Sequence, residues 1–381
     1  MRLALIAPFG LRIKGTASAR VMPLARALAA LGYEVSVWIP PYDTPGDGGS
    51  SWLDEGVSVV NLPCADRLSP RSVARLGWEI AEKVRGWSPD LIHVFKPKGP
   101  SGLAGLLLQR LPIGGWRPPL IIDTDDWEGA HGWNDDPRLG YSRFQKRVFS
   151  WQERYGLTHA SAWTVASDCL RQRAVRFGAP AERVWVVPNG VAIDDWPFQS
   201  WSERRRYVIL YTRFAGVKVE AVKAMWEHVM HLAPASKLMI VGKGLAGEED
   251  RFDDTPGADV TGWLDLESRR LAFSYGAVAI APWSDTPTNR ARSSVKVREL
   301  MASGLPVVGT AVGELPGLLS GAGVVVPPDD PSAMASAVAA VLQDRERARR
   351  LGLLARERAA EFCAWNRIAV ELDRVYGEVL A

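Results

Sequence analysis

Two basic residues on either side of a short turn are the first candidates for chemistry in this sequence. Arg213 and Lys218 follow the apolar run "RRRYVILYT" and enclose a turn that contains Gly216. Arginine presents a planar fork of hydrogen-bond donors and lysine a compact point charge, so the pair suits a diphosphate. The alternative is that both are solvated loop cations.

The second candidate is a carboxylate, Glu299, in the segment "NRARSSVKVRELMASGLPVVGT". We expect a helix here that Ser293 or Ser294 caps and that Gly304 and Pro306 end. At about 100° per residue, Glu299 falls opposite the apolar face of this helix. That face consists of Val297, Leu300 and Met301.

The start of this helix predicts an anion site. Ser294 and Val295 offer free N–H groups and the positive end of the helix dipole, and Lys296 is a further donor-binding candidate. Glu299, about one turn further on, can accept hydrogen bonds from ligand hydroxyls. Together these features suit a nucleotide, with its diphosphate at the N–H groups and its ribose on Glu299. The alternative is an ion pair between Lys296 and Glu299, worth ~0.2–0.5 kcal/mol.

Gly15 and Thr16 form a further candidate near the N-terminus. They end the long loop in "APFGLRIKGTASARVMPLARAL" and stand just before the first expected helix. This position predicts a second anion site. The alternative is a turn glycine followed by an N-cap threonine.

Alternating elements must position these candidates. Short apolar runs such as "RLALIAP", "DLIHVFK" and "PLIIDTD" in the first half, and "SKLMIVG" and "LPVVGT" in the second, are separated by amphipathic helical segments. Near-continuous apolar runs between helices are typical of buried parallel strands. The sequence therefore predicts an α/β fold with doubly wound sheets, in which ligands bind at the carboxyl ends of the strands.

Composition restricts the class of protein. A chain of 381 residues with 47% hydrophobic and 23% charged residues is long enough for two domains. A net charge of +3 does not indicate a nucleic-acid partner. The three cysteines are far apart and have no metal-ligand spacing, so we expect a reducing cytoplasm and no metal. We identify no signal peptide and no apolar run of the roughly 18 residues that span a bilayer.

A glycine motif suggests a different class, the dinucleotide-dependent dehydrogenases. Gly242, Gly244 and Gly247 form a G-x-G-x-x-G directly after an expected strand, and Asp265 lies near the distance of a ribose-binding acid. The fingerprint requires an apolar helix at its third glycine, whereas "EEDRFDD" follows here. We favour a glycine-rich strand end at the ligand-binding edge.

Four stretches together resemble one family, the family 4 (group 1) retaining glycosyltransferases of the GT-B fold. They are "DCLRQRAVRFGAPAERVWVVPNGV", "TRFAGVK", "VRELMASGLPVVGTAVGELPGLL" and "FCAWNRIAVELDRVYGEVL". The resemblance covers nearly the whole chain. It implies two Rossmann-like domains with parallel sheets facing a central cleft. We expect an N-terminal domain at 1–190 for the acceptor, a linker at 191–206, a donor domain at 207–361, and a C-terminal helix at 362–381 that packs back on the N-terminal domain.

The resemblance also implies roles for the candidates. "TRFAGVK" looks like the family's Arg-x4-Lys clamp, so Arg213 and Lys218 would contact the phosphates of a nucleoside-diphosphate sugar and neutralise the leaving group. Glu299 would match the second Glu of the E-x7-E motif, which holds ribose hydroxyls. Gly15 would match the glycine of the first loop, near the phosphate and the acceptor.

Two departures from the family pattern affect the sugar and the chemistry. The first Glu of E-x7-E is replaced by Ala291, and Asp285 or Asn289 could substitute for it. A His-Asp pair that often follows the strand "PLIIDTD" is here Asp125-Asp126. A carboxylate at Asp125 can orient a sugar hydroxyl or receive a proton.

His131, in the nearby stretch "GAHGWN", is the other catalytic candidate. The alternative is an exposed loop histidine without a role.

The expected partners follow from the same resemblance. We expect a nucleotide-sugar donor, a glycan or lipid-linked acceptor, retention of anomeric configuration, and no metal or other cofactor. Residues 106–118 and 143–157 mix aromatic, aliphatic and basic residues, so peripheral membrane contact is one hypothesis and packing on the sheet is the alternative. A catalytically idle GT-B-like protein that binds a nucleotide or a glycan is the alternative function.

Overall fold

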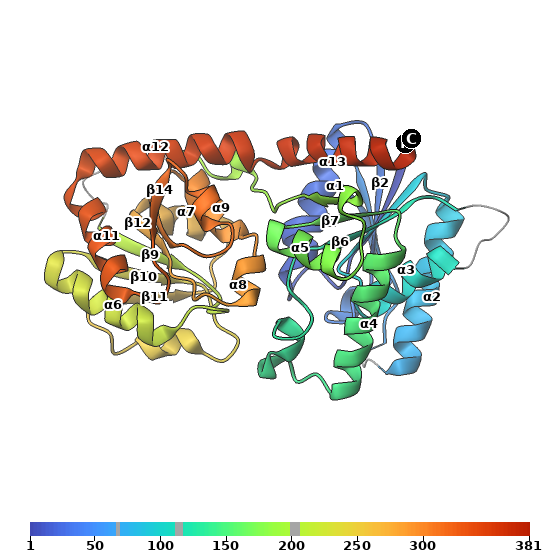
Figure 1. Cartoon of the computed structure of the whole chain (residues 1–381), viewed down its shortest axis with the longest axis horizontal. Coiled ribbons are helices and arrows are strands. Elements are labelled where there is room, and N and C mark those ends of the chain that lie inside the picture. The colour runs from blue at the N-terminus through green and yellow to red at the C-terminus, as the bar shows by residue number, and fades with distance from the viewer. Residues whose placement is uncertain (66–68, 111–116, 199–205) are drawn as a thin grey trace. The chain divides into compact units, whose positions relative to one another are not determined.

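The computed structural model describes residues 1–65, 69–110, 117–198 and 206–381 (Figure 1). The chain forms two compact units. The first contains Met1–Asn189 and Trp365–Ala381, and the second contains Gly190–Ala364. The described residues that follow Gly190 in the expected linker thus belong to the second unit, and residues 199–205 lie outside the description.

The first unit is built on an eight-stranded sheet in the order β3-β4-β2-β1-β5-β6-β7-β8. Its strands are β1 (Arg2–Ile6), β2 (Glu34–Ile39), β3 (Ser51–Asp54), β4 (Val57–Asn61), β5 (Leu91–Phe95), β6 (Leu120–Thr124), β7 (Ala162–Val165) and β8 (Val184–Val186). All neighbours pair in parallel except β3 and β4. The apolar-run pattern predicted the parallel strands, but it missed β3 because an exposed edge strand carries no apolar run.

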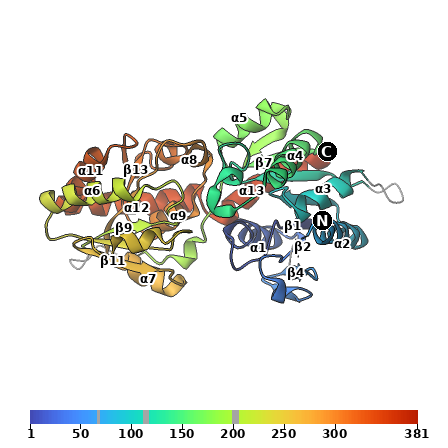
Figure 2. The ribbon, with the colours of Figure 1, turned by 90° about the horizontal axis from the view of Figure 1, so that it is seen from below.

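Helices cover this sheet. They are α1 (Met22–Ala30), α2 (Pro70–Trp87), α3 (Pro100–Arg110), α4 (Arg143–His159), α5 (Asp168–Arg176) and α13 (Trp365–Leu380). α3 packs between α2 and α4 (Figure 2). α13 packs against α1, and the Tyr376 hydroxyl is 2.8 Å from Nδ1 of His93 on β5. The C-terminal helix is thereby joined to the N-terminal sheet by a buried polar contact.

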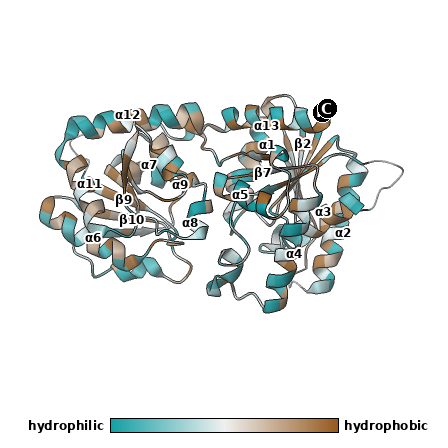
Figure 3. Ribbon diagram, viewed as in Figure 1, coloured by the Kyte–Doolittle hydropathy of each residue, from teal (hydrophilic) through white to brown (hydrophobic). Residues whose placement is uncertain are grey.

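The second unit has a six-stranded parallel sheet in the order β11-β10-β9-β12-β13-β14. Its strands are β9 (Tyr207–Tyr211), β10 (Lys237–Val241), β11 (Ala258–Gly262), β12 (Gly276–Ala281), β13 (Val307–Thr310) and β14 (Gly323–Val326). Its helices are α6 (Val219–Leu232), α7 (Leu266–Ser274), α8 (Pro287–Ala291), α9 (Val295–Ala302), α10 (Leu315–Leu318), α11 (Pro331–Gln343) and α12 (Arg345–Phe362). Apolar strands form the interior of each unit (Figure 3).

Candidate functional site

The Arg213–Lys218 turn lies at the carboxyl end of β9. Phe214 and Gly216 both have positive φ angles, 58° and 71°. A Cβ atom at Gly216 would lie 2.3 Å from Oδ1 of Asn289, so this position requires glycine for space as well as for conformation. The turn thus brings both cations to the expected edge of the sheet.

The two cations have different surroundings. Lys218, whose side chain is 60% exposed, pairs with Asp329 at 2.9 Å. Asp329 also accepts a hydrogen bond from the Ser284 hydroxyl at 3.0 Å. The guanidinium carbon of Arg213 lies 5.8 Å from the ring centre of Trp263, which is 63% exposed. The ion pair between Lys218 and Asp329 is therefore of the weak, exposed kind.

Asn289 supports this turn from α8. Its side chain is fully buried, and its amide donates to the carbonyls of Gly216 and Ser284 at 2.8 Å each. This burial makes Asn289 a support for the loop instead of an open contact for a sugar. Asp285, the other substitute, forms an exposed ion pair with Arg290.

The start of α9 confirms the cap but corrects the anion site. Ser294 is the N-cap, and its hydroxyl accepts from the N–H of Val297 at 3.3 Å. However, the Ser294 N–H donates to Glu314 at 2.6 Å, and Arg298 holds the same carboxylate through two hydrogen bonds of 2.7 Å. The prediction that the Ser294 N–H is free was wrong because Glu314, from the segment after β13, already occupies it. Val295, half-buried, is the next residue of this helix.

Glu299 lies one turn into α9 and its ion pair is with a residue far away in sequence. Nη1 of Arg269, on α7, lies 3.2 Å from its carboxylate, and the two side chains are 19% and 14% exposed. Arg269 also bonds the hydroxyl of Tyr211, at the end of β9. Burial raises the pKa of Glu299, although Arg269 and Lys296 oppose this. The expected alternative, an ion pair with Lys296, is thus replaced by the pair with Arg269.

Lys296 completes a cluster of cations around this carboxylate. Its ammonium lies 5.2 Å from the ring centre of Tyr211. Burial lowers the pKa of Lys296 to about 8, Glu299 opposes the shift, and Arg213 and Arg292 add to it. The surroundings of Glu299 are therefore rich in positive charge.

The dinucleotide fingerprint is not formed. After Gly242 the chain makes a 3-10 turn at Glu248–Phe252, not an α-helix. The Gly244 N–H donates to Glu249 at 2.8 Å. Asp265 caps α7 by accepting from the Ser268 N–H at 2.8 Å. Carboxylates thus occupy the loop amides that would hold a pyrophosphate, and the dehydrogenase alternative was wrong.

The first unit carries its own cluster at the carboxyl edge of its sheet. Gly15 is exposed in the first helical turn, with open space where a Cβ would lie. Thr16 has helical backbone angles, and its hydroxyl donates to Oδ2 of Asp125 at 2.9 Å instead of capping the helix. The N-cap interpretation of Thr16 was therefore wrong, because the hydroxyl joins the first loop to the segment after β6.

Three carboxylates from that segment surround one ammonium. Nζ of Lys96, directly after β5, lies 3.3 Å from Asp125, 2.8 Å from Asp126 and 3.1 Å from Glu128. The exposed fractions of the three acidic side chains are 7%, 26% and 8%. Burial alone would raise the pKa of Glu128, but Lys96 and Lys98 lower it to about 2. Asp126 is the most accessible carboxylate of this cluster.

His131 lies on an exposed turn with a φ of 61°. Its backbone N–H donates to Asp135 at 2.9 Å. In the described part of the chain, His131 takes part in none of the hydrogen bonds or ion pairs that hold Lys96, Asp125, Asp126 and Glu128 together. The structure does not bring it together with Asp125 and Asp126.

Sequence reasoning missed several residues of both clusters. They are Lys96, Glu128, Tyr211, Trp263, Arg269 and Glu314. Lys96 and Trp263 directly follow strands, so the rule that ligands bind at strand ends could have found them. Arg269 and Glu314 carry no such signal, because their contacts depend on tertiary packing.

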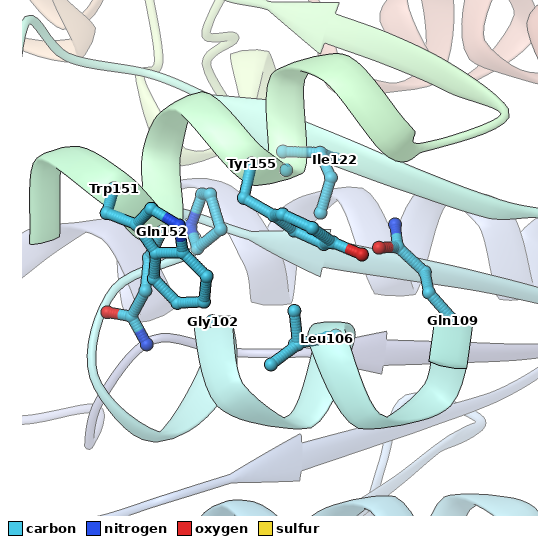
Figure 4. Close-up of a pocket in the computed structure, with 10 residues that line it drawn as sticks. Gly102, Leu106, Gln109, Ile122, Trp151, Gln152 and Tyr155 are labelled. Atoms are coloured by element: carbon cyan, nitrogen blue, oxygen red, sulfur yellow. The ribbon is translucent and has the colours of Figure 1, made fainter. Parts of the chain in front are cut away.

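A shallow hollow and a basic helix face lie elsewhere on the first unit. The hollow encloses about 260 Å³, open solvent included, between α3 and α4 (Figure 4). Leu106, Ile122, Trp151 and Tyr155 are among the residues that line it.

α4 presents Phe144 and Trp151 at 72% and 52% exposure. Its exposed arginines are Arg143, Arg147 and Arg154. Residues 111–116 of the other basic-aromatic stretch lie outside the description. Within the described ranges no helix is long and apolar enough to cross a membrane.

Comparison with known proteins identifies the family. Residues 15–190 match the "Glycosyl transferase 4-like domain" and residues 205–344 match "Glycosyl transferases group 1". The chain therefore belongs to the family 4 (group 1) glycosyltransferases, which have the GT-B fold.

The chain is 24% identical to a phosphatidyl-myo-inositol mannosyltransferase of Mycolicibacterium smegmatis, covering 100% of this chain and 94% of that protein. It is 26% identical to an MMP alpha-(1->4)-mannosyltransferase of Mycolicibacterium hassiacum, covering 100% and 99%. Among solved structures, a sucrose-phosphate synthase from Thermosynechococcus elongatus aligns with a TM-score of 0.75 at 20% identity, covering 100% and 99%. Anabaena HepE in complex with UDP-glucose aligns with a TM-score of 0.68 at 14% identity, covering 99% of each chain.

Proposed function

We propose that this glycosyltransferase moves a hexose from a nucleoside-diphosphate sugar to a hydroxyl acceptor, with retention of configuration and without a metal. The observation that carries the proposal is the edge of the second sheet. There, Arg269 and Lys296 lie beside the buried carboxylate of Glu299, and Arg213 is close enough to Lys296 to lower its pKa. A nucleoside diphosphate would supply further negative charge to a place where cations outnumber carboxylates, and its ribose hydroxyls could donate hydrogen bonds to Glu299.

Each group of the second unit then has a distinct task. Arg213 and Lys218 bind the diphosphate and stabilise its charge as the sugar leaves, a role that a metal ion performs in other transferases. Glu299 accepts hydrogen bonds from the ribose. Trp263, exposed beside Arg213, offers a flat ring for the nucleobase.

The first unit supplies the acceptor side. Asp126 is the most accessible carboxylate of its cluster, and we assign it to a sugar or acceptor hydroxyl. Asp125 holds Thr16 and Lys96. The exposed Gly15 leaves room for a ligand close to the first helix.

The relatives' names favour mannosyl or glucosyl transfer. Two of them are mannosyltransferases, and a glycogen synthase of Mycobacterium tuberculosis is 25% identical over 93% of this chain. The donor is therefore first sought among GDP-mannose, UDP-glucose and ADP-glucose.

Calorimetry with UDP, GDP, ADP and dTDP tests the donor site. We expect one nucleotide to bind, and Arg213→Ala or Lys218→Ala to weaken it by about tenfold, since each removes a charge-assisted contact. Lys223→Ala is the matched control, because Lys223 forms a surface ion pair with Asp254. Unchanged affinity in both clamp variants would refute the assignment of the phosphate site.

Transfer or hydrolysis of the donor distinguishes the enzyme from the catalytically idle alternative. The observation that favours the alternative is the fully buried Ala291 in place of an acidic residue. We expect turnover that survives EDTA and gives a product with the anomeric configuration of the donor. Tight nucleotide binding with no turnover on any donor would support the idle alternative.

We also propose that α4 rests on an anionic membrane surface when the acceptor is lipid-linked. Its exposed face combines Phe144 and Trp151 with basic residues, and its acid Glu153 is buried against Arg173 at 2.9 Å. Such a face binds anionic lipids through charge and shallow aromatic insertion.

Co-sedimentation with vesicles of anionic and of zwitterionic lipid tests this contact. Binding should require the anionic lipid, decrease with salt, and decrease when Arg147→Glu reverses one charge. Lys83→Glu, on α2, is the control. Equal binding to both vesicles, or none at low salt, would refute the contact.

A further inference from the structure

Lys96 is the residue at which three segments of the first unit meet. It follows β5 directly and has a φ of 51°, an uncommon conformation for lysine. Its N–H donates to the Asp123 carbonyl at 2.9 Å, and its carbonyl accepts from the Ser101 hydroxyl at 3.0 Å. The neighbouring strand and α3 thus hold its backbone in a conformation that costs free energy. Such strain is found at functional sites.

The ammonium of Lys96 connects the first loop to the acidic segment after β6. Only 9% of the side chain is exposed. Nζ donates to the Thr16 hydroxyl at 3.2 Å and to Asp126 at 2.8 Å, and it lies within 3.3 Å of Asp125 and 3.1 Å of Glu128. One side chain thus holds both segments that carry the candidates of this unit.

Other charged groups face the cluster but do not replace Lys96. Lys98 pairs with Glu128 at 2.9 Å. Burial lowers the pKa of Lys14, Asp43 opposes this, and Lys96 and Lys98 add to it. Tyr42 is half-buried near Asp43 and Glu128. Lys96 lies within ion-pair distance of all three carboxylates, whereas Lys98 pairs with Glu128, so removing Lys96 would leave like charges crowded in a poorly hydrated place.

We propose that Lys96 is a positioning residue for glycosyl transfer. Its ammonium keeps Asp126 ionised and directed at the ligand, and it fixes the loop that contains Gly15 through the Thr16 hydroxyl. This inference rests on the proposed function, in which Asp126 accepts a hydrogen bond from a hydroxyl of the sugar or the acceptor. Without the ammonium, Asp126 binds a proton more readily, since nearby like charges disfavour its ionised form. Once protonated, Asp126 can no longer accept a charge-assisted hydrogen bond from the ligand hydroxyl.

The pH profile of kcat/KM for transfer tests this role. Lys96→Met keeps most of the side-chain volume and removes the charge, so its acid limb should move upward by about one pH unit or more. Lys96→Arg keeps the charge and should restore most of the wild-type profile. Lys83→Met, an exposed lysine on α2, should leave the profile unchanged. An acid limb at the wild-type position in Lys96→Met would overturn the inference.

A second measurement does not require turnover. Protonation relieves the crowding of carboxylates, so the loss of Tm in Lys96→Met should be largest near pH 7 and shrink toward pH 5. Loss of packing alone would give a deficit that is the same at every pH, and that result would also overturn the inference. If the wild type transfers no sugar but the deficit depends on pH, the proposed function fails while the charge role of Lys96 stands. If the wild type transfers sugar and Lys96→Met keeps its pH profile, only the inference fails.

Discussion

Replacing Glu299 by glutamine separates a ribose-binding carboxylate from a structural one. Glutamine has nearly the same shape but carries no charge. Hydrogen bonds to charged groups contribute ~1.5–3 kcal/mol, whereas neutral ones contribute ~0.5–1.5 kcal/mol. Two ribose hydroxyls on one carboxylate therefore predict a loss of about 10- to 100-fold in nucleotide affinity, at ~1.4 kcal/mol per factor of ten.

The assay compares two ligands in two proteins by calorimetry. One ligand is the nucleoside diphosphate that the wild type prefers, and the other is its 2′,3′-dideoxy form, which has no ribose hydroxyls. The wild type should prefer the first ligand strongly, and Glu299→Gln should reduce this preference by about 10- to 100-fold. Glu227→Gln, an exposed residue of α6, is the matched control. This comparison isolates the contact between the carboxylate and the ribose, since both ligands have the same diphosphate and base.

The same substitution also breaks the pair with Arg269. Because the two side chains are 19% and 14% exposed, we expect a loss of ~1–3 kcal/mol of folding stability, between the values for exposed and fully buried pairs. A thermal melt must first establish that the variant is folded at the assay temperature. If Glu299→Gln weakens both ligands equally, the carboxylate acts only by holding Arg269, and the ribose assignment is refuted.

Three further predictions concern buried ionisable groups. Lys296 has a pKa of about 8 and should become fully protonated when a diphosphate binds. Calorimetry at pH 8 in buffers of different ionisation enthalpy should therefore show the uptake of about half a proton, and Lys296→Met should abolish this uptake. Asp123→Asn should lower the free energy of urea unfolding by ~3–5 kcal/mol, because Arg20 would remain buried without its anion; an unchanged midpoint would contradict this. Burial lowers the pKa of His93, so the folded state takes up fewer protons than the unfolded chain. The stability of the fold should therefore decrease as the pH is lowered below 6.5, and His93→Gln should flatten the change in Tm between pH 7 and 5.5.

The sequence predicts the sheets well because buried parallel strands leave a strong signal. Runs such as "DLIHVFK" and "SKLMIVG" became β5 and β10, central strands whose two faces are both covered. The exposed β3 has no such run and was missed. Ser294 was found as a cap because capping is local in sequence.

The contacts within the clusters were harder to predict because they depend on tertiary structure. Glu314 occupies the Ser294 N–H from 20 residues away, and Arg269 reaches Glu299 from 30 residues away. A single sequence contains no periodicity that reports such pairs. The burial of Asn289 could not be anticipated either, because it follows from the space beside Gly216.

The charges around Lys296 differ from those of a salt-bridge network that only stabilises the fold. In a network built for stability, each cation has its own carboxylate, as Arg298 has Glu314 at 2.7 Å. Here Arg213, Arg269 and Arg292 all act on Lys296, and the carboxylate that opposes them, Glu299, already pairs with Arg269. Burial is the main cause of the depressed pKa of Lys296, Glu299 opposes the shift, and the three arginines add to it. If the proposed donor binds here, its diphosphate would add the negative charge that favours a protonated Lys296, and the cations would already be in place before the ligand arrives.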